Sequence, residues 1–180
     1  LDYDKSGSLW AFPSDASLPV EVYDRTTVVR TLDSPFSGLR LAAAIAPEGT
    51  RVVQSIQTED AESFLDVGVV LRDANSIPLA LNNGLRVQPV LGTPIAVSWQ
   101  EPASIRVLET TASGLTAFSE YSISGPRTQL PMPPNIGIEL HTAASSASSY
   151  MLSEAGEVWL FSANSWRRIA TGVTSISQLR

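Results

Sequence analysis

The sequence contains no cysteine, which excludes disulfides, thiolate nucleophiles and cysteine-based zinc sites. Basic residues are also sparse: there is one lysine, and Arg167 and Arg168 form the only adjacent basic pair. Neighbouring residues of a strand point to opposite faces, so even this pair makes a poor basic patch. The net charge is −6, whereas nucleic acid is held by clustered Lys and Arg. We therefore expect no nucleic-acid partner.

Long apolar runs and helical patterns are missing as well. No stretch reaches the roughly 18 apolar residues of a membrane-spanning helix. No segment repeats apolar residues at i, i+3, i+4 and i+7 between capping residues, and the phosphate-binding glycine patterns GxGxxG and GxxxxGK[ST] do not occur. Hydrophobic residues nevertheless make up 43% of the 180 residues and charged residues 17%, which is typical of a packed domain. The composition favours one folded domain made of strands.

What the chain does contain is a repeated phrase of a turn followed by a strand. DKSGSLWAF (4–12) and SEAGEVWLF (153–161) share glycine, tryptophan and phenylalanine at matching positions. Gly7 and Gly156 can adopt the positive φ that tight hairpin turns require, and the residues after them are aromatic and apolar, as in strands. We therefore expect Trp10 to have an equivalent at residue 159 on an equivalent strand.

A second pair of phrases lies between the first two. PEGTRVV (47–53) and PASIRVL (102–108) share proline, then arginine four residues later, then valine and an aliphatic residue. The four turns lie near positions 7, 49, 104 and 156, so they recur every 42 to 55 residues. Repeats of about 40–50 residues with several short strands each are typical of β-propeller blades.

The sequence therefore predicts an all-β fold with almost no helix: a β-propeller, or a fragment of one, of about four small antiparallel blades. The proline-rich segment LPMPPN (130–135) is expected to connect two blades, because proline cannot donate to a strand ladder. The inner strand of the first blade is expected to precede Leu1 and to be missing. The whole chain, 1–180, is one propeller domain or its C-terminal portion, with blades at about 1–38, 39–93, 94–135 and 136–172 and a possible closing strand at 173–180.

No group of residues carries a recognisable catalytic signature. His141 is the only histidine, and no second histidine or nucleophile motif accompanies it, so we interpret it as an ordinary hydrogen-bonded strand residue. Glu59, Asp60 and Glu62 lack the ligand spacing of a calcium loop, which favours a solvated loop. Asp2 and Asp4 lie on one strand face, but nothing aims two acids at a common point as a glycosidase requires. We expect no catalytic residue, no metal and no cofactor.

The tryptophans are the remaining candidates for binding. Trp10, Trp99 and Trp159 occupy repeat-related strand positions, which favours a structural role between blades. Trp166 is expected to be partly exposed beside its two arginines. Trp166, Arg167 and Arg168 are therefore the candidate binding residues. A sialidase-type turn would read Ser-x-Asp-x-Gly-x-Thr-Trp, and Ala155 replaces its aspartate here.

Four phrases, in order and over almost the whole chain, resemble the C-terminal β-propeller of the actinobacterial LpqB lipoproteins. In that family we expect S-x-D-G-T-R-V-A, then V-V-R-D followed by proline and leucine, then tryptophan with L-x-V-L, and finally G-x-L-W with a later tryptophan. Pro47-Glu48 and Pro102-Ala103 depart from the usual residues of that pattern. The corresponding segments are LRLAAAIAPEGTRVVQ, FLDVGVVLRDANSIPLAL, VSWQEPASIRVLE and SEAGEVWLFSANSWRRIATGV.

The resemblance implies an extracytoplasmic lipoprotein, attached to the cell membrane by a lipid anchor upstream of Leu1 and preceded by a GerMN-type domain. It also implies an accessory role in two-component signalling, in contact with the extracytoplasmic part of an MtrB-type sensor histidine kinase. Two alternatives remain open. One is a propeller that binds carbohydrate or another envelope polymer through exposed aromatic rings, and the other is a propeller hydrolase.

Overall fold

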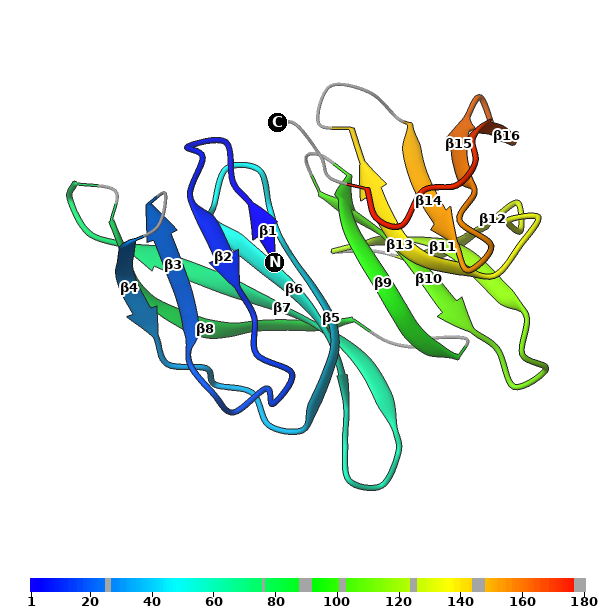
Figure 1. Cartoon of the computed structure of the whole chain (residues 1–180). Helices are drawn as coiled ribbons and strands as arrows, with labels where there is room; N and C mark the ends of the chain where they lie inside the picture. The colour runs from blue at the N-terminus through cyan, green and yellow to red at the C-terminus, as the bar shows by residue number, and fades with distance from the viewer. Residues whose placement is uncertain are drawn as a thin grey trace. The chain divides into compact units, whose positions relative to one another are not determined.

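The computed structural model of the chain describes residues 1–24, 27–75, 77–87, 92–100, 103–123, 126–143 and 148–176. Over these residues the protein consists of β-strands joined by turns and loops, without any helix (Figure 1). It follows that no described segment forms an apolar helix long enough to cross a membrane.

The strands form four four-stranded antiparallel sheets, each made of four strands in sequence order. The chain divides into two compact units with two sheets each: unit 1, Leu1–Gln88, and unit 2, Pro89–Leu179. Radially repeated four-stranded sheets are the blades of a β-propeller. The predicted fold class, all-β with four propeller blades and no helix, is confirmed.

Unit 1 contains sheets 1 and 2, which we number along the chain. The strands of sheet 1 are β1 (Asp2–Tyr3), β2 (Leu9–Ala11), β3 (Val20–Asp24) and β4 (Thr27–Leu32). Those of sheet 2 are β5 (Leu39–Ile45), β6 (Arg51–Gln57), β7 (Ser63–Arg72) and β8 (Pro78–Val87).

Unit 2 contains sheets 3 and 4, and the proline-rich segment 131–136 connects them, as predicted. The strands of sheet 3 are β9 (Thr93–Gln100), β10 (Ser104–Thr110), β11 (Thr116–Ser122) and β12 (Arg127–Leu130). Those of sheet 4 are β13 (Gly137–Thr142), β14 (Ser149–Ser153), β15 (Val158–Ser162) and β16 (Ser165–Ala170).

The two matching phrases at 4–12 and 153–161 do not occupy equivalent places, so the predicted equivalence of their tryptophans is wrong. Trp10 lies on the second strand of sheet 1, whereas Trp159 lies on the third strand of sheet 4. The shared feature is the turn itself: Gly7 and Gly156 have φ of 84° and 72°, and each donates its amide to the residue three positions earlier. A turn of this kind can join any two strands of a hairpin. The shared phrase therefore marks a hairpin turn and not an equivalent position within a blade.

Two expectations about the chain ends also need correction. The first strand of sheet 1 is not missing, because Asp2–Tyr3 pairs with β2 as the two-residue strand β1. Residues 173–176 form no strand; the amide of Val173 donates to the carbonyl of Gly156, and that of Ile176 to a carboxylate oxygen of Glu139. The rest of the expected closing strand, 177–180, lies outside the described residues.

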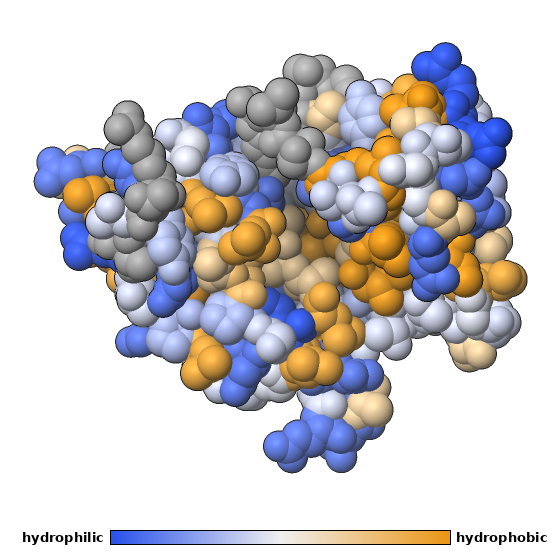
Figure 2. All heavy atoms as spheres, viewed as in Figure 1, coloured by the Kyte–Doolittle hydropathy of each residue, from blue (hydrophilic) through white to orange (hydrophobic). Residues whose placement is uncertain are grey.

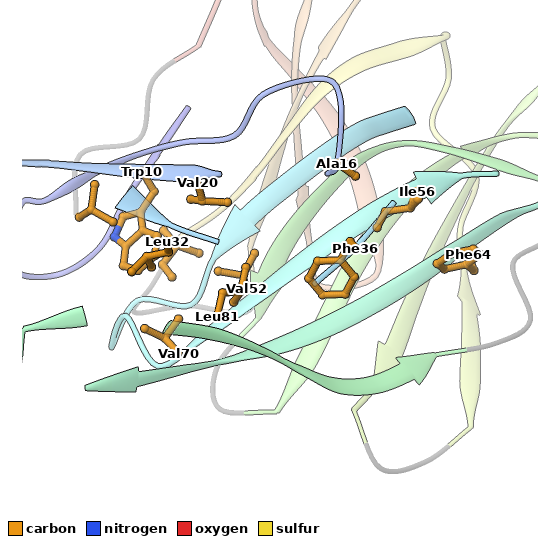
Figure 3. Close-up of a cluster of buried hydrophobic side chains, with 12 residues drawn as sticks. Trp10, Ala16, Val20, Leu32, Phe36, Val52, Ile56, Phe64, Val70 and Leu81 are labelled. Atoms are coloured by element: carbon orange, nitrogen blue, oxygen red, sulfur yellow. The ribbon is translucent and has the colours of Figure 1, made fainter. Parts of the chain in front are cut away.

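The core of unit 1 lies between sheets 1 and 2. Alternation along each strand gives both sheets an apolar face, and the two faces point toward each other (Figure 3). Trp10, Val20 and Val52 are completely buried there, and the indole Nε1 of Trp10 donates to Oδ2 of Asp4 at 3.0 Å. The cluster comprises Trp10, Ala16, Val20, Val22, Leu32, Phe36, Ile45, Val52, Ile56, Phe64, Val70 and Leu81.

Unit 2 has its own core between sheets 3 and 4. The Phe118 and Phe161 rings meet edge to face with centroids 5.0 Å apart, a favourable arrangement for aromatic pairs. Polar bonds also join the two sheets: the Thr142 amide donates to Oγ of Ser98 at 2.8 Å. The buried residues of this cluster are Ala96, Leu108, Phe118, Leu140, Met151 and Phe161.

Candidate functional site

The three predicted binding residues lie side by side on β16, but they do not form one surface. Trp166 is half-buried: its ring packs 5.1 Å from the centroids of both Phe118 and Phe161, and its Nε1 donates to the Pro131 carbonyl at 2.9 Å. Register places Trp166 opposite Phe161 and Arg167 opposite residue 160, so the two side chains point to opposite faces. The indole of Trp166 therefore belongs to the core of unit 2.

The two arginines differ from each other as well. Arg167 and Arg168 are both exposed. Among the described residues, Arg168 alone of the two has an ion pair, with Glu157 at 2.6 Å, and it lies over the Trp159 ring at 6.0 Å. The hydrogen bond from Arg168, followed by that from Trp159, lowers the pKa of Glu157. Arg168 thus has a local structural role, and Arg167 is the exposed arginine for which the described residues show no ion pair.

The candidate catalytic residues lie apart. His141, on β13, is half-buried with its Nε2 3.8 Å from a carboxylate oxygen of Glu139. Within the described ranges, no three acidic or histidine side chains come together in a way that could hold a metal ion. Asp2 accepts the amide of Ile45 at 3.0 Å, and buried Asp4 accepts from Trp10 and its own turn. Both carboxylates therefore accept hydrogen bonds that connect turns and strands within unit 1.

A cleft at one end of unit 1 is the candidate site that the structure adds. Three loops form it: 12–19 after β2, 33–38 after β4, and 58–62 after β6. In a meander of antiparallel strands these three connections share one end of the sheets, and Figure 1 shows them together at the lower edge of unit 1. The cleft has a volume of about 670 Å³ and is lined by Ser14, Asp15, Ser17, Ser37, Gly38, Leu39, Gln57, Thr58 and Glu59.

Two acidic residues and five other polar residues line the cleft, together with Gly38 and Leu39. Oδ1 of Asp15 accepts from the amide and hydroxyl of Ser17 at 2.9 and 2.7 Å, and these hydrogen bonds, the hydroxyl first, lower the pKa of Asp15. Over the described part of the chain, no hydrogen bond or ion pair engages the side chains of Ser37, Gln57 or Glu59. The turn that carries Glu59 forms a hydrophilic projection in Figure 2. A ligand would therefore meet the hydroxyl of Ser37, the amide of Gln57 and the carboxylate of Glu59 without displacing an internal partner.

A buried arginine, Arg40, fixes one wall of the cleft. Arg40 is only 6% exposed, and its guanidinium donates to the carbonyls of Pro13 and Ala16 and to the side-chain amide oxygen of Gln54. Burial lowers the pKa of Arg40 to about 10, with a smaller opposing effect from Asp15, so the group stays charged at neutral pH. The arginine thus fastens the loop after β2 onto sheet 2.

Backbone contacts complete this wall. The Ala16 amide donates to the Gly38 carbonyl at 2.8 Å, the Arg40 amide donates to the Ser14 carbonyl at 2.6 Å, and Asp15 forms a β-bridge with Leu39. Gly38 has φ of 111°, and a Cβ there would lie 2.6 Å from the backbone oxygen of Gln57. Only glycine allows this close approach, so residue 38 is a structural requirement of the cleft.

The sequence contains one local signal for this site. Asp15 and Ser17 in SDAS match an Asx turn, in which an aspartate side chain accepts the amide two residues later. The acidic TEDAES loop by itself indicates only a solvated loop. The sequence alone does not bring together loops from two sheets, so the cleft could be found only from the fold.

Comparisons with known proteins place the fold in the β-propeller class. No family model matches the chain, and no curated protein matches it. Among solved structures, a protein assigned as TolB from Agrobacterium tumefaciens superposes with a TM-score of 0.66 at 13% identity, covering 95% of this chain and 61% of that one. A protein of unknown function from Bacteroides thetaiotaomicron gives a TM-score of 0.55 at 15% identity, covering 89% and 40%. The chain thus spans less than two thirds of either neighbour.

Proposed function

We propose that this chain is a non-catalytic protein-interaction domain and that the cleft of unit 1 is part of its binding surface. The observation that carries the proposal is the cleft itself, in which Ser37, Gln57 and Glu59 have no side-chain partner among the described residues and whose wall is fixed by Arg40 and Gly38. Loops held by a rigid scaffold are where proteins commonly place binding residues, and a preformed site loses little entropy on binding.

The resemblance to LpqB-type propellers suggests the partner and the location. The proposed partner is the extracytoplasmic part of a sensor histidine kinase, and the proposed location is outside the cytoplasm on a membrane-anchored lipoprotein. The proposed mechanism needs no chemistry on the propeller. If the domain binds one conformation of the kinase more tightly than another, saturating binding shifts the equilibrium constant between the two conformations by the ratio of the two affinities.

Isothermal titration of the folded chain into a purified sensor-kinase extracytoplasmic domain tests the proposal. We expect saturable binding that weakens in the double variant Asp15→Asn/Glu59→Gln. Glu48→Gln is the matched control, because Glu48 is an exposed acid in the turn between β5 and β6, at the other end of sheet 2. A folded chain that gives no binding heat overturns the kinase as partner, and turnover of chromogenic glycosides overturns the non-catalytic assignment.

Binding of carbohydrate or another envelope polymer is the alternative that one observation favours. Hydroxyl, amide and carboxylate groups like those of the cleft also bind sugar hydroxyls. Among the described residues, however, no aromatic ring on which a sugar could stack lines the cleft, and Trp166 packs in the core of unit 2. A glycan array probed with the chain separates the two functions.

A further inference from the structure

We propose that the chain associates with a second copy of itself head to tail, so that the outer face of sheet 4 in one copy packs on the outer face of sheet 1 in the next. The outer face of each sheet is the face opposite to the core of its own unit. This inference goes beyond the proposed function, because it assigns two faces that are not part of the cleft.

The outer face of sheet 4 carries a row of side chains that crosses all four strands. Register places the members of this row opposite one another: His141, Tyr150, Leu160 and Arg167. Phe161, the neighbour of Leu160, is buried in the core of unit 2, so the row points to the other side of the sheet. Tyr150 and Leu160 are half-buried, and Arg167 is exposed without an ion pair in the part of the chain described. The row thus ends in a positive charge.

The outer face of sheet 1 has a matching apolar row with a negative charge beside it. Register places Tyr3, Leu9 and Tyr23 opposite one another on β1, β2 and β3. Trp10, the neighbour of Leu9, is buried in the core of unit 1, so this row points away from that core. Tyr3 is 49% exposed, and Leu9 and Tyr23 are half-buried. Glu21, two residues before Tyr23 on the same face, accepts a hydrogen bond from the Tyr23 hydroxyl and supplies the charge.

The segment after β16 leads onto the outer face of sheet 4. The Val173 amide donates to the Gly156 carbonyl at 3.0 Å, and the Ile176 amide donates to Glu139 at 2.9 Å. Glu139 lies on the outer face because its neighbour Leu140 lies in the core of unit 2. In unit 1 the connection from sheet 1 to sheet 2 likewise contacts the loop after the second strand and then leads onto the face where the next sheet packs. The outer face of sheet 4 is therefore built as a face onto which a further sheet packs.

Sheets within each unit pack with equivalent strands over each other. In unit 2 the Thr142 amide, on the first strand of sheet 4, donates to Ser98 on the first strand of sheet 3. The Phe118 and Phe161 rings meet between the two third strands. In unit 1, β1 contacts β5 and β4 contacts β8. The same arrangement between copies places β15 on β3 and β16 on β4.

Charge makes sheet 1 the partner of sheet 4. In this arrangement Leu160 packs on β3 of the next copy, and Arg167 on β16 comes near Glu21 on the strand beside β4. Two copies of the sheet 4 face would instead bring Arg167 against its own equivalent, and like charges repel. The pairing is therefore head to tail, and interfaces of this kind extend into rings or chains.

Sedimentation velocity of the purified chain at a series of concentrations, without any partner, tests the inference. We expect species larger than a monomer whose share rises with concentration. Arg167→Glu and Glu21→Arg each bring like charges together and should raise the apparent Kd about tenfold or more. The double variant Arg167→Glu/Glu21→Arg should restore association, because it exchanges the two charges.

Matched controls separate the two faces from general effects of charge and apolar surface. Glu48→Arg reverses an exposed acid in the turn between β5 and β6, away from both faces, and should leave association unchanged. Leu160→Asp should weaken association about tenfold or more, whereas Leu115→Asp, at an exposed leucine in the turn after β10, should not. Urea denaturation checks that each variant is folded.

The outcomes separate this inference from the proposed function. A chain that stays monomeric at all concentrations overturns self-association, and so does a double variant that associates no better than Arg167→Glu alone. If the kinase domain protects the β15–β16 hairpin of the monomeric chain from hydrogen exchange, that face belongs to the kinase and the inference is overturned. Self-association of a chain that does not bind the kinase domain supports the inference and overturns only the proposed partner.

Discussion

Arg40 should make a large contribution to the stability of unit 1, and replacing it with methionine tests that directly. The substitution keeps a long apolar side chain but removes every donor that now reaches the Pro13, Ala16 and Gln54 oxygens. Pro13 is partly exposed, so its carbonyl can bind water instead. Ala16 and Gln54 are completely buried, so their oxygens lose their donors without replacement.

The expected loss of unfolding free energy is about 2–4 kcal/mol. A buried acceptor left without a donor costs about 1–3 kcal/mol, and two such acceptors remain in Arg40→Met. The loss is reduced because the variant no longer buries a charge, a penalty visible in the lowered pKa of Arg40, about 10. Arg30→Met is the control, because Arg30 is an exposed arginine on β4, and it should change stability by less than about 0.5 kcal/mol.

Urea denaturation gives the stability change, and amide hydrogen exchange shows its location. The amides of Ala16 and residue 40 now donate across the loop contact, so they should exchange faster in Arg40→Met than in the wild type. If Arg40→Met unfolds within about 0.5 kcal/mol of the wild type and both amides keep their protection, the arginine does not hold the cleft wall and the reasoning fails.

Three further predictions concern backbone, core and charge. Gly38→Ala should lower the free energy of unfolding, measured by urea denaturation, by about 2–4 kcal/mol, because its Cβ would lie 2.6 Å from a backbone oxygen. Gly114→Ala, which has open space around its Cβ, should lower it by only about 1–2 kcal/mol. Equal losses in the two variants would contradict the close approach at residue 38. Trp166→Ala should destabilise unit 2 by about 3–5 kcal/mol and Trp166→Phe by clearly less, as followed by near-UV circular dichroism during denaturation; an unchanged stability would instead favour a surface role. Glu157 has a lowered pKa in the fold, so it contributes stability above its unfolded pKa of about 4.3, and that contribution is lost as the pH falls through the folded value. Glu157→Gln should therefore flatten the loss of stability below about pH 5, and an unaltered acid profile would refute its pairing with Arg168.

The fold could be predicted because short strands and tight turns are local features of sequence. The phrase PEGTRVV at 47–53, for example, places a strand after its turn, and β6 begins there at Arg51. Along each strand, apolar and polar residues alternate or apolar residues form a continuous run. Each strand ends at a turn with polar residues or glycine, and this combination is typical of hairpins. Four consecutive meanders of this kind then favour propeller blades over other all-β folds.

The equivalence of the two tryptophan phrases could not be judged in the same way. Gly7 and Gly156 form the same kind of turn, but one joins the first two strands of its sheet and the other the second and third. Turn chemistry depends on four or five residues, whereas the position of a turn within a blade depends on how many strands precede it. The two-residue strand β1 carries too little sequence signal to be counted in advance.

The cleft depends on contacts that are distant in sequence. Arg40 lies about 25 residues from the loop that it holds, and Gly38 meets a backbone oxygen on β6. Burial of an arginine on a strand does not follow from a local pattern, because most arginines are exposed. By contrast, the inward packing of Trp166 follows from the register of β15 and β16, which places Trp166 opposite Phe161.

Hydrogen exchange of the chain with and without a sensor-kinase extracytoplasmic domain tests the central claim most directly. The account predicts that the partner slows exchange in peptides covering 13–18, 33–39 and 57–62, the three loops of the cleft, and leaves the β15–β16 hairpin unchanged. Protection of the β15–β16 hairpin around Arg167 without protection of the cleft loops would contradict the cleft as the binding site.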